Sequence, residues 1–402
     1  MDKNENNNNN IKNDAQDYLI DRIFFKKYRC IQKIGQGSFG FIYKAECDNK
    51  FYALKFENSK TGKNILKKES SMLIYLKGPN IPYIKTYGTS GDYNILVMQL
   101  LGEDLQSLLL KRKKFSIKTV CLLAYQMITI LEYIHNKNII HRDIKPENFL
   151  MGLDEFSKYL YLTDFGLSKP YDRNSSTHYT PNNEGRKLTG TPRYASINAL
   201  RGLEQGPRDD LESIGYVLVY LLKGELPWQR IVGKSKAEKI KKLLLKKIEF
   251  SSTDLCNGLP NIFERYIDYC KDLQFGDTPD YQMLKNLFIQ ELQDENEEFD
   301  YNYDWSKSVI NSKKDKNINY NKYASDNNYE NNNNNQSNND QNNNNNQINI
   351  VNTEDRPIIV KNSNVFKEME NENNNDEKEE NQENENQENQ ENKQTVCCCL
   401  IY

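Results

Sequence analysis

The first long patterned stretch of the chain alternates between apolar and polar residues and predicts paired strands. Residues 31–46 alternate on either side of a cluster of glycines, which indicates a strand, a turn and a second strand. Residues 51–56 continue at strand spacing. The mainly apolar run 95–102 predicts a buried strand that leads into a linker. The amino-terminal part of the patterned region is therefore expected to be rich in β-structure.

Two further segments carry apolar residues at helical spacing. Residues 64–76 place Ile65, Met72, Leu73 and Leu76 on one face of a helix. A longer helix is predicted over residues 115–138, and its apolar face consists of Leu122, Leu123, Met127, Ile130, Leu131 and Ile134. This long helix leads the chain directly to a group of polar residues at 141–148.

Composition separates a foldable region from two polar ends. Residues 1–17 are rich in Asn, and residues 306–396 consist mainly of Asn, Gln, Glu and Lys. Such segments bury too little apolar surface to offset the conformational entropy of the chain, so we expect both to be disordered. The packed core is expected between residues 19 and 305.

The formal net charge of −3 hides an uneven distribution. Residues 367–393 contain 11 acidic residues and 3 lysines, a balance of −8, which leaves +5 for the rest of the chain. A mildly basic body beside an acidic tail suits an acidic or phosphorylated partner, and the excess is too small to indicate nucleic acid. Residues 234–247 contain seven lysines, which fit either a nuclear localisation signal or, by preference, a solvated helix face.

The scattered cysteines suggest a reducing compartment. Cys30, Cys47, Cys121, Cys256 and Cys270 fit no zinc-binding spacing, and no signal peptide precedes them. We therefore expect buried, reduced thiols in a cytoplasmic protein, with the nucleus as a second location. No window approaches 18 consecutive apolar residues, so no membrane-spanning helix is expected.

The glycine cluster is a candidate phosphate-binding loop. Glycine lets backbone N–H groups approach a phosphate that a Cβ would obstruct. Such a cluster also occurs in plain hairpins, and a dinucleotide-binding loop is disfavoured because β-type residues rather than a helix follow it. The candidate ATP-binding residues of this region are Ile34, Gly35, Gly37, Ser38, Gly40 and Ile42.

A lysine and a glutamate extend this candidate site. Lys55 follows Gly40 at the distance expected for a strand lysine that holds ATP phosphates. Glu69, on the helix predicted for residues 64–76, is the candidate ion-pair partner of Lys55. The alternative is that Glu69 pairs with Lys68 or lies on a solvated helix face. Apolar walls for adenine are expected from Ala53, Met98, Leu101 and Leu150, which are equally compatible with an ordinary core.

Four polar residues after the long helix have the chemistry of phosphoryl transfer. Asp143 accepts or orients a hydroxyl proton, and Lys145 neutralises charge on the transferring group. Asn148 and Asp164 offer oxygen ligands for Mg²⁺ bound to ATP phosphates. The transition state spreads charge over several oxygens, so catalysis depends on positioning and electrostatics.

Together these motifs resemble the eukaryotic protein kinase family. More narrowly, residues 188–198 and 208–216 are similar to casein kinase 1, in which the sequence of Ser196, Ile197 and Asn198 replaces the usual Ala-Pro-Glu. The resemblance spans residues 28–305. It implies an α+β, bilobal protein kinase fold, with a β-rich N-lobe, a mainly helical C-lobe and disordered termini.

The resemblance also implies a monomeric Ser/Thr kinase that prefers acidic or phosphate-primed protein substrates. The basic anion site of the family falls here on Arg186, Arg193 and Lys239. Arg230 is either a fourth charge of this anion site or, by preference, a surface cation that takes no part in it. Asp210 matches the buried aspartate that braces the catalytic loop of the family.

The chain ends in a cysteine-rich sequence. Cys399-Leu-Ile-Tyr402 has the C-a-a-X form, which suggests prenylation of Cys399, with Cys397 and Cys398 as palmitoylation candidates. Two lipids would give stable attachment to the cytoplasmic face of a membrane. The alternative is three fortuitous thiols.

Two other functions share parts of this pattern. A pseudokinase scaffold is disfavoured because Lys55, Asp143, Asn148 and Asp164 are all present. A small-molecule phosphotransferase shares the catalytic residues but would not explain residues 188–216. The favoured prediction is an active protein Ser/Thr kinase that uses ATP and Mg²⁺.

Overall fold

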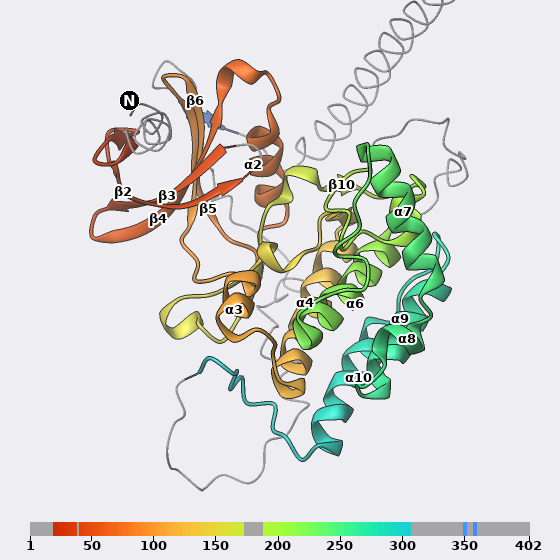
Figure 1. The fold of residues 1–402 in the computed structure, drawn as a ribbon. Coiled ribbons are helices and arrows are strands. Elements are labelled where there is room, and N and C mark those ends of the chain that lie inside the picture. Colours follow the sequence, from red (N-terminus) through yellow and green to blue (C-terminus); the bar gives the residue numbers. More distant parts are fainter. Residues whose placement is uncertain (1–18, 38–39, 173–187, 307–348, 352–356, 360–402) are drawn as a thin grey trace, which may run out of the picture.

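The chain forms two lobes of different composition. The computed structural model describes residues 19–37, 40–172, 188–306, 349–351 and 357–359. Figure 1 shows a sheet-rich lobe built from the amino-terminal residues and a larger helical lobe built from the residues that follow. This arrangement confirms the predicted α+β, bilobal fold.

The first lobe is a twisted sheet with one helix against it. Its helix is α2 (Ile65–Tyr75), and its strands are β1 (Ile23–Phe24), β2 (Tyr28–Gly37), β3 (Gly40–Cys47), β4 (Lys50–Asn58), β5 (Ile84–Ser90) and β6 (Tyr93–Gln99). The order in the sheet is β1-β2-β3-β4-β6-β5-β11-β12, and among the described strands β5 and β11 pair in parallel while the other neighbours are antiparallel. The last two strands of this order, β11 (Asn349–Val351) and β12 (Pro357–Ile359), belong to the segment 306–396, most of which lies outside the described residues.

Strand β6 shows how the sheet is covered on both faces. Ile95 and Val97 are fully buried in a cluster on one face, whereas Leu96 and Met98 belong to the core on the side of α2. Successive side chains of a strand point to opposite faces, so an apolar run fills both. This agrees with the buried strand predicted for residues 95–102.

The helical lobe is organised around α4 (Ile117–Asn136), which packs against α6 (Pro207–Lys223) and α10 (Tyr281–Asp294). The prediction placed this helix at residues 115–138. It begins two residues later because the Ser116 side chain accepts a hydrogen bond from the Thr119 N–H and caps the helix. The remaining helices are α3 (Leu105–Arg112), α5 (Ile197–Leu200), α7 (Lys236–Glu249), α8 (Ser252–Cys256) and α9 (Asn261–Asp272).

By length and composition alone, α4 is apolar enough to cross a membrane. Most of its side chains, however, are buried inside the helical lobe, including Leu122, Leu131 and Ile134. A core helix of this kind passes the same test as a membrane span. The burial explains its hydrophobicity without a membrane.

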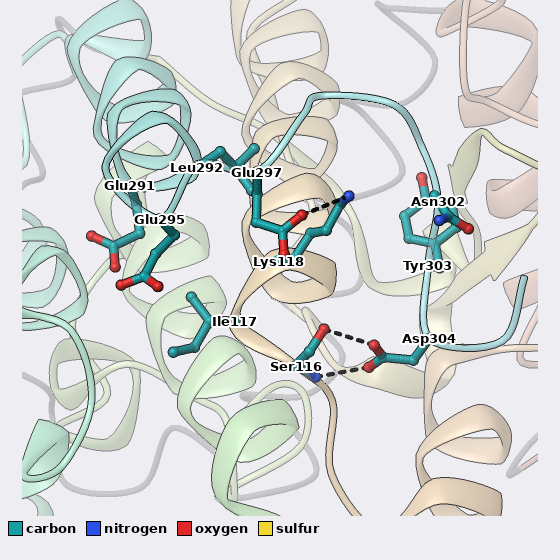
Figure 2. Close-up of a pocket in the computed structure, with 10 residues that line it drawn as sticks. All are labelled: Ser116, Ile117, Lys118, Glu291, Leu292, Glu295, Glu297, Asn302, Tyr303 and Asp304. Carbon is teal, nitrogen blue, oxygen red and sulfur yellow. Dashed lines mark hydrogen bonds and ion pairs between the residues drawn. The ribbon is translucent and has the colours of Figure 1, made fainter. Parts of the chain in front are cut away.

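The chain after α10 returns to the start of α4 and fastens there (Figure 2). Asp304 accepts two hydrogen bonds from Ser116, one from the backbone N–H at 2.7 Å and one from the hydroxyl at 2.6 Å. Lys118 pairs with Glu297 at 2.9 Å. The helical lobe therefore includes the described residues up to about 305.

The predicted thiols are where the sequence analysis expected them. Cys30, Cys47, Cys121, Cys256 and Cys270 are buried free cysteines. Burial raises the pKa of the Cys30 thiol to about 12, because the thiolate would be poorly solvated there. These cysteines are therefore unreactive core residues.

Short strands in the helical lobe present the polar residues of interest. They form two antiparallel pairs, which are β7 (Ile139–Ile140) with β10 (Lys169–Pro170) and β8 (Phe149–Met151) with β9 (Leu160–Leu162). The loop 141–148 connects β7 to β8, and Asp164 follows β9. These polar segments lie where the helical lobe meets the sheet.

Candidate active site

Lys55 joins the two lobes through a buried ion-pair network. Its Nζ lies 2.6 Å from Glu69 Oε2 on α2 and 2.9 Å from Asp164 Oδ1 in the helical lobe. Burial opposes the charge on Lys55, but the two carboxylates outweigh this effect and raise its pKa. Lys55 also lowers the pKa of Asp164 against the effect of burial. The predicted ion pair between Glu69 and Lys55 is therefore present, in place of a solvated position for Glu69.

Glu57 holds the helix that carries Glu69. Its Oε1 accepts a hydrogen bond from the Ile65 N–H at 3.0 Å, and its Oε2 accepts one from the Asn94 side chain at 3.2 Å. Asn64, the residue before the helix, makes no side-chain capping bond. Glu57 therefore satisfies the start of α2 from the neighbouring strand. The sequence analysis missed this residue because its partners are distant in sequence.

The glycines lie in two paired strands, since Gly37 ends β2 and Gly40 begins β3, the neighbour of the strand that carries Lys55. Gly35 and Gly37 lie in β2, and a Cβ on Gly40 would lie 1.7 Å from the Phe56 carbonyl oxygen. Glycine is thus required at position 40 for close packing of β3 on β4 as well as for any approach of phosphate. Ser38 lies outside the described residues. Ile34 is exposed, whereas Ile42 packs partly against the core.

The predicted adenine walls come from three neighbouring elements. Ala53 of β4 and Met98 of β6 are direct cross-strand neighbours, and both are buried. Leu150 of β8 and Leu101 of the linker after β6 are partly exposed. Ala53 and Met98 also belong to the main core, so a role as core residues and a role as walls of an adenine site are compatible.

Asp143 is the buried carboxylate at the centre of the catalytic loop. Thr191 donates a hydrogen bond to its Oδ1 at 2.7 Å, and Lys145 forms an ion pair with its Oδ2. Asn148 Nδ2 also lies 3.4 Å from Oδ2, whereas Oδ1 keeps a second lone pair with which to accept a further proton donor. Asp143 is therefore oriented from both sides. Thr191 lies in the segment singled out by the resemblance, but no role was predicted for it.

Asp210 fixes the backbone of this loop from below. It accepts hydrogen bonds from the backbone N–H groups of His141 at 2.7 Å and Arg142 at 2.9 Å, and it contacts His135 Nε2 at 3.0 Å. Burial alone would raise the pKa of Asp210, but these partners lower it. The predicted bracing role of Asp210 is confirmed.

The backbone is strained at three points around Asp143. Arg142 and Asp164 have positive φ angles of 66° and 65°. Gly190 has φ of 92°, and a Cβ there would lie 2.3 Å from the Arg142 carbonyl oxygen. Uncommon conformations of this kind persist where surrounding contacts over-determine them, often at functional sites.

Two oxygen donors could hold a divalent metal ion. Asn148 donates from its Nδ2 to the Asp143 carbonyl oxygen at 2.8 Å, which leaves its amide oxygen available, and Asp164 offers a carboxylate. The described residues contain no cluster of three or more His, Cys, Asp or Glu side chains suited to a metal. Two protein donors fit a hard cation that is completed by substrate phosphates and water rather than by an all-protein cage.

Two of the three predicted anion-binding residues, Arg193 and Lys239, lie among the described residues. Arg193 lies beyond Thr191, with its guanidinium carbon 5.8 Å and 5.9 Å from the ring centroids of Tyr194 and Tyr220. Lys239 is exposed on α7. Arg186 lies outside the described residues, as do Cys397, Cys398 and Cys399. Arg230 forms an exposed pair with Glu225, which favours the surface interpretation of that arginine.

The arrangement has the parts for phosphoryl transfer. It combines a lysine between two carboxylates, a carboxylate held by a hydroxyl and an ammonium group, and oxygen donors for a metal ion. A comparison with known families agrees with this geometry. A model described as the protein kinase domain matches residues 28–278.

The first prediction concerns Glu57. We expect Glu57→Ala to raise the KM for ATP and lower kcat/KM by roughly tenfold, because losing a buried helix cap costs about 1 kcal/mol or more and loosens Glu69. Steady-state kinetics with varied ATP would measure this. The matched control is Glu46→Ala, which removes a partly exposed pair with Arg29. Equal kinetics for both variants would contradict the role of Glu57.

The second prediction concerns the buried Asp209 of α6. Burial, only partly opposed by hydrogen bonds from Ser196 and Gly206, raises the pKa of Asp209 from 3.8 to about 7. Between these values the folded chain keeps a proton that the unfolded chain has lost. The free energy of unfolding should therefore fall as the pH rises through this interval.

Asp209→Asn should remove that loss. Relative to the variant, the wild type is expected to lose roughly 2 kcal/mol of stability between pH 5 and pH 7. Urea denaturation at several pH values would measure it. Asp268→Asn, at an exposed position on α9, is the control. Parallel stability curves for wild type and Asp209→Asn would show that Asp209 does not titrate in this range.

Proposed function

The chain belongs to the protein kinase family, and we propose that it transfers the γ-phosphoryl group of ATP, with Mg²⁺, to serine and threonine in acidic or phosphate-primed proteins. Phosphoryl transfer to a protein follows from the family. The finer proposal rests on the resemblance of residues 188–198 and 208–216 to casein kinase 1. Among the described residues, the position of Arg193 is the observation that supports the preference for acidic or phosphate-primed substrates.

The side chains around Asp143 support a direct transfer mechanism. The oxygen of the substrate hydroxyl attacks the γ-phosphorus while Asp143 accepts the proton of that hydroxyl. The bond between the γ-phosphorus and the β-phosphate oxygen breaks in the same step. Thr191 and Lys145 hold the carboxylate in place, and Lys145 also stabilises charge on the transferring group. Asn148 and Asp164 would hold Mg²⁺, which supplies positive charge at the phosphates when bound.

Lys55 positions the nucleotide in this mechanism. An ammonium group that is held between Glu69 and Asp164 stays charged and has little freedom to move. It can therefore contact ATP phosphates without a large cost in side-chain entropy. The glycine loop from β2 to β3 lies on the same lobe and would cover those phosphates.

Arg193 supports the preference for negative charge. It lies two residues beyond Thr191, the partner of Asp143, and its guanidinium is stacked near two tyrosine rings. A partly buried, pre-oriented guanidinium binds a phosphate dianion by charge-assisted, bidentate hydrogen bonds. Lys239 lies on α7, two helical turns before a lysine that contacts the segment after Arg193. Both cations are thus attached to elements near the catalytic base.

The proposal can be tested with a peptide library that contains primed and unprimed versions of each sequence. We expect Arg193→Ala to reduce the ratio of kcat/KM for primed over unprimed peptides by about tenfold or more, because a charge-assisted pair is lost. Arg265→Ala, at an exposed position on α9, is the matched control. An unchanged ratio in Arg193→Ala would remove Arg193 from the substrate site.

We also propose that lipids hold the kinase at the cytoplasmic face of a membrane. The support is the sequence Cys397-Cys-Cys-Leu-Ile-Tyr402, with prenylation at Cys399 and palmitoylation at Cys397 or Cys398. Cells supplied with a labelled isoprenoid precursor should incorporate label into the wild type but not into Cys399→Ser. Absence of label from the wild type would refute the prenylation.

A further inference from the structure

The segment Arg193–Ile197 has little secondary structure of its own. It runs from the Thr191 turn into the four-residue helix α5. The Tyr194 and Ala195 N–H groups donate to the Thr191 carbonyl, both at 3.1 Å, and the Ser196 and Ile197 carbonyls accept the first bonds of α5, both at 3.0 Å. Other backbone groups of a loop must find partners elsewhere or lose free energy on burial. The partners of this segment therefore decide how firmly it is held.

Side chains of the helical lobe hold the segment by four bonds, three of them to its backbone and one to the Ser196 side chain. Trp228 Nε1 donates to the Arg193 carbonyl at 2.8 Å, and Lys247 Nζ donates to the Ala195 carbonyl at 2.5 Å. The Ser196 hydroxyl donates to Asp209 at 2.5 Å. The Ile197 N–H donates to Glu212 at 2.9 Å. The segment is thus fastened at four of its five residues.

Lys247 is the least expected member of this set. The lysine-rich run 234–247 was predicted to be a solvated helix face, yet only 1% of Lys247 is exposed. Its Nζ lies 4.3 Å from the ring centroid of Tyr216 and 4.9 Å from that of Trp228. The prediction was wrong for Lys247 because spacing along α7 turns this lysine, with Leu243, toward the lobe.

Burying an ammonium group is costly, and lysine is rarely buried without a partner. Here the two aromatic faces and the Ala195 carbonyl compensate part of that cost. Glu212 favours the charged form, but burial still lowers the pKa of Lys247 to about 7. The same two rings serve other members of the set, because Tyr216 donates to Glu212 at 2.6 Å and Trp228 donates to Arg193.

We infer that Lys247, together with Trp228, Asp209 and Glu212, forms a clamp that fixes Arg193–Ile197 as the platform for the protein substrate. Lys247 is a positioning residue that acts through the Ala195 carbonyl and does not contact the reacting atoms. The inference rests on the proposed function in that this platform lies beside Asp143 and carries Arg193. It assigns substrate positioning to side chains on α6, α7 and the turn before α7.

The clamp makes a specific kinetic prediction. In Lys247→Met the apolar stem remains but the bond to Ala195 is lost, so the platform loses one of its four attachments. We expect the KM for peptide to rise about tenfold or more, while the KM for ATP stays within about twofold. ATP hydrolysis in the absence of peptide should also stay within about twofold. Lys247→Arg, which keeps the charge and donors, should recover part of the loss.

The experiment uses the full chain and the peptide that wild type phosphorylates best in the library described above. Lys241→Met, at an exposed position on the same helix, is the control and should match wild type. Thermal unfolding is measured for every variant. If Lys247→Met does not fold, Trp228→Phe gives the same test, since it keeps a ring but removes the donor to Arg193.

The possible outcomes separate the two proposals. Peptide kinetics within twofold of wild type in a folded Lys247→Met or Trp228→Phe would overturn the clamp. A parallel loss of ATP binding and peptide binding would also overturn it, since the residues would then support the whole lobe. A wild type without preference for primed peptides would refute the proposed substrate class but would leave the clamp result intact.

Discussion

The active site depends on one helical turn that carries three buried acidic side chains. Asp209, Asp210 and Glu212 lie at the start of α6, and each is at most 3% exposed. They accept hydrogen bonds from two loops that have little regular structure. Asp210 accepts from the backbone N–H groups of His141 and Arg142, whereas Glu212 and Asp209 accept from the Ile197 N–H and the Ser196 hydroxyl of the segment Arg193–Ile197. A helix N-terminus favours negative charge, which offsets part of the cost of burying these groups. Both loops therefore take their positions from the same rigid element.

The two lobes meet through a different kind of interaction. Lys55 reaches from β4 to Glu69 and Asp164, and Glu57 holds the helix that presents Glu69. A Cβ on Gly166 would lie 2.8 Å from Ile65, so α2 also packs closely on the segment after Asp164. The position of α2 is thus coupled to that of the Asp164 carboxylate. Four side chains and one close contact at Gly166 define the arrangement of the lobes.

Sequence patterns predicted the parts of the molecule whose signals are local. The apolar period of α4, the alternation of the strands and the spacing of Lys55, Asp143 and Asp164 were sufficient for the fold and for finding residues that lie at the candidate site. The start of α4 differed because a single capping serine decides it, and periodicity is blind to such a bond.

The residues that sequence analysis missed share a physical cause. Glu57, Thr191 and Lys247 each act through partners between 8 and 52 residues away in sequence. A lone polar residue in a strand, a turn or a lysine-rich helix carries no sign of such a distant partner. Only the tertiary structure shows that these side chains turn inward, and burial then makes their bonds energetically important.

Both loops are hydrogen-bonded to α6, so Asp143 and the proposed peptide-binding segment Arg193–Ile197 move together as one rigid body. The movement that admits ATP and releases ADP then takes place at the seam between the lobes, which the Lys55–Asp164 ion pair crosses. Opening that seam exposes an ammonium and a carboxylate to water and removes their mutual attraction. Each opening of this seam therefore has to break the Lys55–Asp164 ion pair, a contact made apart from Asp143.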